Sequence, residues 1–172
     1  QNDYKIKVET VNDEDASQEI NIQALSETVI KGSIVDGEGN VIDDFNGNIE
    51  SIIFDSEQNL KTRGYTNPRA SDVSTSTVFD YTDFTNTIYA GTTTVENGKF
   101  EVSFVTPKDI LYSDGNGKMS FFASSDDESE YVQGSFSNYT VNGTDPTAVQ
   151  ETNAPTIDAL YLNKVEFKNG AT

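Results

Sequence analysis

The residues of this chain that could do chemistry are almost all carboxylates. It has 29 aspartates and glutamates against 11 lysines and arginines, and it has no cysteine and no histidine. The sequence therefore excludes thiol nucleophiles, Ser-His-Asp hydrolases, thiol redox chemistry and zinc sites built on thiolate or imidazole. Calcium binding and glycoside hydrolysis remain open to carboxylates. We predict no catalytic residue and no cofactor.

Several acidic turns offer the oxygen ligands that calcium prefers. They are Asp36/Glu38/Asn40, Asp43/Asp44, Asp114/Asn116 and Asp126/Asp127/Glu128/Glu130. None has the spacing of an EF-hand loop; after Asp36, for example, the third position is glutamate and the sixth is valine. Solvated turns are the favoured interpretation. A calcium ion, if one binds, is assigned to Asp114, Asn116, Asp126 and Asp127.

Glycoside hydrolysis is the second activity that carboxylates alone could support. Glycoside hydrolysis needs two carboxylates about 5 to 10 Å apart in a groove, and no tryptophan or distinctive spacing singles out a pair here. Tyr65, Tyr81 and Tyr89 are candidates for an aromatic ligand platform, although aromatic residues of a sandwich usually belong to its core. Sequons begin at Asn138 and Asn142 and matter only in a source that glycosylates asparagine.

The net charge of −18 narrows the range of partners. A field of this sign repels phosphate backbones and anionic lipid, so we expect no nucleic-acid partner and no direct membrane insertion. No apolar run approaches the roughly 20 residues of a membrane span, and the first residues lack the pattern of a signal peptide. The only methionine is Met119, so we expect a piece of a longer protein.

The elements that must position these side chains are β-strands, because apolar residues alternate and never recur at helical spacing. A central stretch, 28–55, predicts two strands joined by turns, with Asn48 to Phe54 covered on both faces. The clearest hairpin joins Thr87–Val95 to Phe100–Val105 through a type I′ turn at Asn97-Gly98. Further strands are expected at Tyr4–Val11, Met119–Ala123 and, as the last of the main body, Tyr131–Phe136.

These strands predict an all-β, immunoglobulin-like antiparallel β-sandwich of about seven or more strands, with no substantial helix and a small barrel as the competing fold. The predicted core consists of Ile30, Ile34, Ile53, Phe100, Val102, Phe104 and Phe121. The long polar excursion at 55–87 should contain at least one short strand. Its aromatic residues, Tyr65, Phe79, Tyr81 and Phe84, should be held against the sandwich.

Composition predicts the domain organisation. We expect residues 1–150 to form the sandwich module, and residues 151–172 to be a linker followed by a new apolar strand. Residues Gly143 to Ala154 are polar and contain Pro146, as linkers do. A lone strand at Ile157 to Leu162 has no stable fold in water, so we expect it to pair with an edge of the sandwich or with another copy.

Five motifs occur in a fixed order along the chain: Ala24–Gly32 (ALSETVIKG), Asp44–Gly47 (DFNG), Ile88–Gly91 (IYAG), Val95–Phe100 (VENGKF) and Val105–Ile110 (VTPKDI). Together they resemble the region that follows the gingipain-type cysteine peptidase domain in the PorU family, which comprises surface signal peptidases, or sortases, of type IX secretion in Bacteroidetes. The similarity covers about Tyr4 to Phe167, and the 55–87 stretch is longer and more polar than the family pattern. On this resemblance, residues 151–172 hold a linker and the first strand of a following module, cut short.

The resemblance implies a protein on the extracellular face of the outer membrane. Its catalytic domain removes C-terminal secretion signals and transfers cargo to an anionic lipopolysaccharide. The family's catalytic cysteine and histidine lie upstream of this region, so the chain would be a non-catalytic scaffold or interaction module. Implied partners are the upstream peptidase domain, the downstream sandwich module and secretion-system proteins. The alternative is a free-standing surface adhesion or glycan-binding domain.

Overall fold

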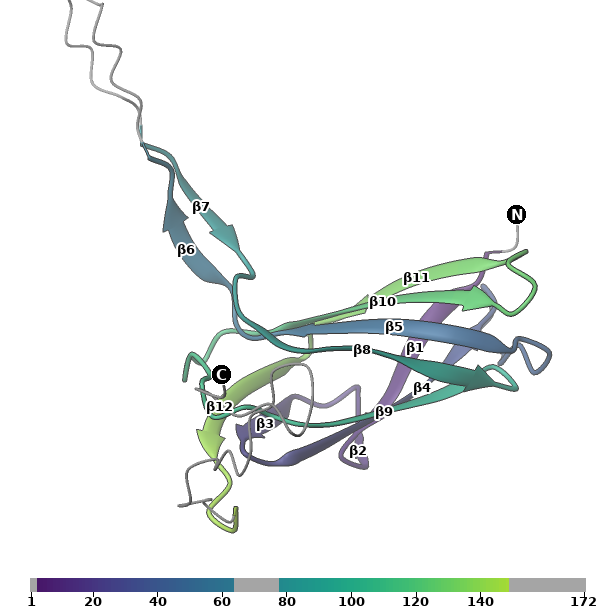
Figure 1. Ribbon diagram of the computed structural model, residues 1–172, viewed down its shortest axis with the longest axis horizontal. Helices are drawn as coiled ribbons and strands as arrows, with labels where there is room; N and C mark the ends of the chain where they lie inside the picture. Colours follow the sequence, from purple (N-terminus) through teal and green to yellow (C-terminus); the bar gives the residue numbers. More distant parts are fainter. Residues whose placement is uncertain (1–2, 64–77, 149–172) are drawn as a thin grey trace, which may run out of the picture.

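The computed structural model describes residues 3–63 and 78–148, and every regular element in these ranges is a β-strand (Figure 1). No helix that could span a membrane occurs in the described ranges. The strands are β1 (Lys5–Val11), β2 (Glu14–Asp15), β3 (Ile20–Ala24), β4 (Glu27–Val35), β5 (Gly47–Phe54), β6 (Gln58–Lys61), β7 (Asp80–Asp83), β8 (Thr87–Glu96), β9 (Lys99–Val105), β10 (Lys118–Ser125), β11 (Tyr131–Phe136) and β12 (Tyr139–Thr144).

Eight strands form one antiparallel sheet in the order β11-β10-β5-β8-β9-β4-β1-β2. β8 and β9 pair only next to their turn, at Val95–Phe100 and Glu96–Lys99. Beyond this point β8 follows β5 and β9 follows β4, so the sheet divides into two halves (Figure 1). The predicted all-β sandwich is confirmed, with its two layers made by one sheet that curls over itself.

The two halves close on a single core. All seven predicted core residues are buried, and they belong to one cluster with residues from both halves. The rings of Phe100 on β9 and Phe121 on β10 lie 5.7 Å apart and connect the halves directly. On the far side β1 meets β11, where Gly134 lies against Ile6. Closure at this seam needs glycine, because an added Cβ would lie 2.7 Å from Cβ of Ile6.

The predicted hairpin turn is confirmed in its geometry. Asn97 and Gly98 have φ of 51° and 71°, as a type I′ turn requires. Gly98 also lies so close to the chain at Ile42 that a Cβ there would be 2.4 Å from the Ile42 carbonyl oxygen. The turn that starts both halves of the sheet therefore depends on these two residues.

One prediction about the central stretch is wrong. β5 is not covered on both faces: Ile49, Ser51 and Ile53 are buried, whereas Glu50 and Ile52 are exposed, Ile52 by 41%. β4 and β5 are also not neighbours, because β8 and β9 lie between them in the sheet. The turn residues after Val35 lead across the sandwich instead of folding β5 back onto β4.

A further strand, β12, follows β11, so β11 is not the last strand of the body. β12 pairs in parallel with β3, and its Tyr139 and Val141 are completely buried. β12 also continues to Thr144, inside the stretch interpreted as a linker. The turn-forming residues Asn138, Asn142 and Gly143 concealed this strand, since only three residues between them alternate. The predicted boundary at residue 150 and all of 151–172 lie outside the described residues.

The long excursion contains short strands, as expected. β6 and β7 form a two-stranded hairpin that projects away from the sandwich (Figure 1). Its aromatic residues are not held against the sandwich, because Phe79 is 62% and Tyr81 46% exposed. Phe84 is the exception: its ring lies 6.1 Å from that of Phe54, with Nζ of Lys118 5.8 Å from its centroid. Tyr65 lies outside the described residues.

Candidate functional site

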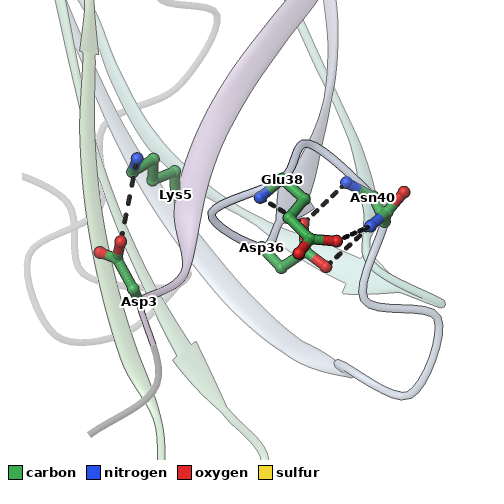
Figure 2. A network of polar contacts seen from close by, with 5 residues as sticks. All are labelled: Asp3, Lys5, Asp36, Glu38 and Asn40. Carbon is green, nitrogen blue, oxygen red and sulfur yellow. Dashed lines mark hydrogen bonds and ion pairs between the residues drawn. The ribbon is translucent and has the colours of Figure 1, made fainter.

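The turn at Asp36, Glu38 and Asn40 uses its carboxylate for its own structure (Figure 2). Asp36 accepts hydrogen bonds from the backbone amides of Glu38 and Asn40, both at 2.9 Å, and from the Asn40 side chain at 3.0 Å. The side-chain and backbone bonds from Asn40 lower the pKa of Asp36. The neighbouring ion pair of Lys5 and Asp3, at 3.9 Å, is exposed (Figure 2). This cluster stabilises the crossing after β4.

The calcium candidates Asp126 and Asp127 lie in the turn between β10 and β11. Hydrogen bonds from the side chains of Ser125 and Ser129, at 2.6 and 2.8 Å, and from the Ser129 amide lower the pKa of Asp127 to about 2. Asp127 is thus an anion that already has three donors. The backbone amide of Asp126 donates to the carbonyl of Asn46, which ties this turn to the start of β5.

The structure brings two predicted acidic clusters together at one end of the sandwich. Asp44 joins Asp126, Asp127 and Glu130 around a pocket of about 490 Å³. Within the described residues no three carboxylates are grouped as a metal site would group them. The sequence alone could not predict that these clusters lie together, because their proximity depends on β5 pairing with β10, which is far away in the sequence.

The other calcium candidates, Asp114 and Asn116, lie elsewhere. Asp114 accepts a hydrogen bond of 2.7 Å from the Asn142 side chain, and Asn116 makes a β-bridge to Thr140. Both contacts fasten the loop before β10 to β12. The four predicted calcium ligands therefore lie in two separate parts of the fold: Asp114 and Asn116 contact β12, and Asp126 and Asp127 lie in the β10–β11 turn.

Asp55, which the sequence analysis did not single out, is a completely buried carboxylate at the base of the projecting hairpin. One oxygen accepts from the Ser56 amide at 2.7 Å; the other accepts from the Leu111 amide at 2.6 Å and from Asn86 at 3.2 Å. Asp55 also donates its own amide to the carbonyl of Asn86. It joins both legs of the hairpin to the loop before β10. Its position after an apolar run was the only available signal.

The proposed aromatic platform is not assembled as predicted. Tyr89 is stacked on Phe104, with centroids 4.7 Å apart, so its ring fills the sandwich. Tyr81 is exposed on the separate β6–β7 hairpin. A different pair is exposed on the outer face of β10 and β11: Phe122 and Tyr131 stack at 5.9 Å and are 36% and 57% exposed.

Both sequon asparagines are occupied by internal hydrogen bonds. The Asn138 side chain donates to the carbonyls of Ala16 and Gln18, at 3.3 and 2.7 Å. The Asn142 side chain donates to Asp114. In this fold both amides hold the β3–β12 pair to its surroundings.

Comparison with solved structures relates this chain to the crystal structure of dimeric latent PorU from Porphyromonas gingivalis. The two share 27% sequence identity with a TM-score of 0.70, over 97% of this chain and 15% of that one. This chain thus spans about 15% of the length of the PorU chain that it matches. No protein-family model and no curated protein matches it. The agreement of fold and sequence over nearly the whole chain relates it to one region of PorU.

Proposed function

We propose that this chain is a non-catalytic, immunoglobulin-like module of a PorU-like surface signal peptidase of type IX secretion, in which it acts as a scaffold. The observation that carries the proposal is the match to PorU over 97% of this chain but only 15% of that one, which is how one module of a long protein would match. The absence of cysteine and histidine supports a role without peptidase chemistry.

The proposed partners are the upstream peptidase domain and the downstream module of the same chain, together with secretion-system proteins. The proposed location is the extracellular face of the outer membrane in a member of the Bacteroidetes. The acidic surface fits a scaffold that stays apart from anionic lipid and nucleic acid, because its net charge of −18 opposes both.

The test is a peptidase assay on a peptide that carries a C-terminal secretion signal. We expect no turnover above background by the isolated chain, and turnover by the parent protein with its peptidase domain. A parent variant with its catalytic cysteine changed to alanine is the control. Clear turnover by the isolated chain would refute the non-catalytic assignment, and a parent gene without an upstream peptidase domain would refute the family role.

A second candidate function is glycan binding at a cell surface, favoured by the exposed stack of Phe122 and Tyr131. Beside it lies a groove of about 400 Å³ whose lining includes Ser120, Gln133 and Ser135. Exposed aromatic rings next to hydroxyl and amide groups suit the apolar and polar faces of a sugar. A glycan array probed with the chain and with Phe122→Ala tests it: binding that the substitution abolishes supports this function, and no binding removes it.

A further inference from the structure

Four asparagines in the described residues precede a glycine, and the fold treats them differently. They are Asn46, Asn97, Asn116 and Asn142. In such a pair the glycine amide nitrogen can attack the carbonyl carbon of the asparagine side chain, because glycine has no Cβ to hinder the approach. The reaction requires the two atoms to come about 3 to 3.5 Å apart. Whether each site can react therefore depends on where its two groups point.

At three of the four sites one of the reacting groups is held elsewhere. The amides of Gly98 and Gly117 donate to carbonyls in other parts of the chain, at 2.8 and 2.9 Å. The side-chain oxygen of Asn46 accepts from the Asn97 amide at 2.9 Å. These contacts direct the nitrogen or the side-chain carbonyl away from its reaction partner.

Asn142 is the exception. Its Oδ1 accepts from the amide of Gly143 at 2.8 Å, so the attacking nitrogen and the side-chain carbonyl already meet. Because a C=O bond is about 1.23 Å long, the carbonyl carbon lies within about 4 Å of that nitrogen. The pair also lies in an irregularity of the β3–β12 ladder, where the register shifts between Val141 and Thr144 and Gly143 has φ of 80°. Only a small movement separates the pair from the geometry of reaction.

A second contact holds the Asn142 side chain in this orientation. Its Nδ2 donates to Asp114 at 2.7 Å while its Oδ1 faces the Gly143 amide. The reversed side-chain amide would place its NH2 group against a donor and its oxygen against a carboxylate, so hydrogen bonding selects the orientation described. Asn142 and Gly143 are half-buried and line a surface groove of about 490 Å³, through which solvent reaches them.

We propose that Asn142-Gly143 is a site of spontaneous deamidation in the folded protein. Hydroxide from solvent takes the Gly143 amide proton, and the nitrogen forms a bond to Cγ of Asn142. The Cγ–Nδ2 bond then breaks as Nδ2 takes a proton from water and leaves as ammonia. Water opens the resulting succinimide at either carbonyl, which gives aspartate or isoaspartate at position 142. The reaction involves no oxidation or reduction, and it does not depend on the proposed scaffold function.

The product acts on the loop before β10. The new carboxylate lies opposite Asp114, so a hydrogen bond is replaced by repulsion between like charges. In the isoaspartate form the backbone also gains a methylene group beside the carbonyl of residue 142, which accepts from the Asn21 side chain at 3.1 Å. Deamidation therefore weakens one connection between this loop and β12. It does so with time, and faster at higher pH because hydroxide starts the reaction.

Peptide mapping of the folded 172-residue chain during incubation at about pH 8 tests the proposal. We expect Asn142 to deamidate about tenfold faster or more than Asn46, Asn97 and Asn116, because only its glycine amide is in position. Isoaspartate among the products identifies the succinimide route. The same series in concentrated urea is the control, and there the four rates should converge. Equal rates at the four sites of the folded chain, or reaction of Asn142 only in urea, would overturn the proposal.

Two substitutions test the effect of the product. Asn142→Asp places the carboxylate opposite Asp114, and we expect it to lower the melting temperature by about 2 to 4 °C. Asp114→Asn removes the charge and supplies an amide donor, so adding Asn142→Asp to it should change the melting temperature by no more than about 1 °C. An equal loss in both backgrounds, or no loss in either, would contradict the proposed effect on the loop.

Discussion

At the residue scale, the buried side chain of Asp55 joins three segments by hydrogen bonds: the two legs of the β6–β7 hairpin and the loop before β10. Replacing it with alanine leaves the Leu111 and Ser56 amides without their side-chain acceptor at a buried site, and leaves the Asn86 side chain with only the Asp109 carbonyl. We expect Asp55→Ala to lower the free energy of unfolding by about 3 kcal/mol, measured by urea denaturation. Asp80→Ala, on an exposed ion pair with Lys61, is the control and should unfold like the wild type. Equal midpoints for both variants would contradict this role.

Tyr139 makes the stability of the fold sensitive to alkaline pH. Burial, and secondly the nearby carboxylate of Asp55, raise the pKa of Tyr139 far above its ordinary value. Above about pH 10 the unfolded state loses a proton that the folded state keeps, so stability falls as pH rises, by about 1.4 kcal/mol per pH unit. This contribution is fully present below pH 10. Its loss begins at the pKa of the unfolded chain.

Tyr139→Phe should remove that dependence. We expect a flatter decline of the unfolding free energy between about pH 10 and 11, together with a loss of about 1 kcal/mol at neutral pH, because the hydroxyl donates to the carbonyl of Phe54. Tyr131→Phe is the control, since Tyr131 is 57% exposed. The same alkaline slope in the wild type and Tyr139→Phe would show that another group controls it.

At the scale of elements, closure of the curled sheet depends on how tightly β11 approaches β1. A Cβ at Gly134 would lie 2.7 Å from Cβ of Ile6 and 3.3 Å from its carbonyl oxygen, so one strand must move. We expect Gly134→Ala to cost about 1 to 3 kcal/mol of unfolding free energy. Gly37→Ala is the matched control, because its Cβ would meet only Asp3, at 3.5 Å. Identical denaturation curves for both variants would show the seam to be loose.

The sequence predicted those elements whose pattern is local. Alternation at Phe100, Val102 and Phe104, and the Asn97-Gly98 turn, were sufficient to identify the hairpin and its core face. The same reasoning failed where tertiary pairing decides the structure. β12 forms through long-range pairing with β3, which its short alternating run of three residues does not indicate. The exposed face of β5 was misjudged because Ile52 is apolar, although Glu50 indicated that face.

The candidate site was harder to predict than the fold, for a physical reason. Carboxylates in turns look alike in sequence, whether they cap a turn as Asp36 does or lie buried as Asp55 does. Only the pairing of distant strands brings Asp44 to the turn at Asp126. Side-chain roles that depend on a contact between remote segments have no local pattern from which they can be predicted.

At the scale of the whole molecule, charge opposes compactness. The chain carries a net charge of −18, and the three ion pairs found in the described residues, Lys5–Asp3, Lys31–Asp13 and Lys61–Asp80, are all exposed. Exposed pairs contribute little to stability, so they do not offset the repulsion among carboxylates that folding brings together. Salt screens this repulsion, because the Debye length falls from about 30 Å at 10 mM to about 10 Å at 100 mM.

Sodium chloride should therefore stabilise this fold. Between about 10 and 500 mM we expect the unfolding free energy to rise on the order of 1 kcal/mol, or roughly 2 to 4 °C in melting temperature, followed by circular dichroism. The control is the same series near pH 4.5, close to the isoelectric point of about 4.1. There the carboxylates are partly protonated, so screening has less repulsion to remove and the rise should shrink. An equal rise at both pH values would point to a general effect of salt on apolar burial, and self-repulsion would then not limit the stability of this molecule.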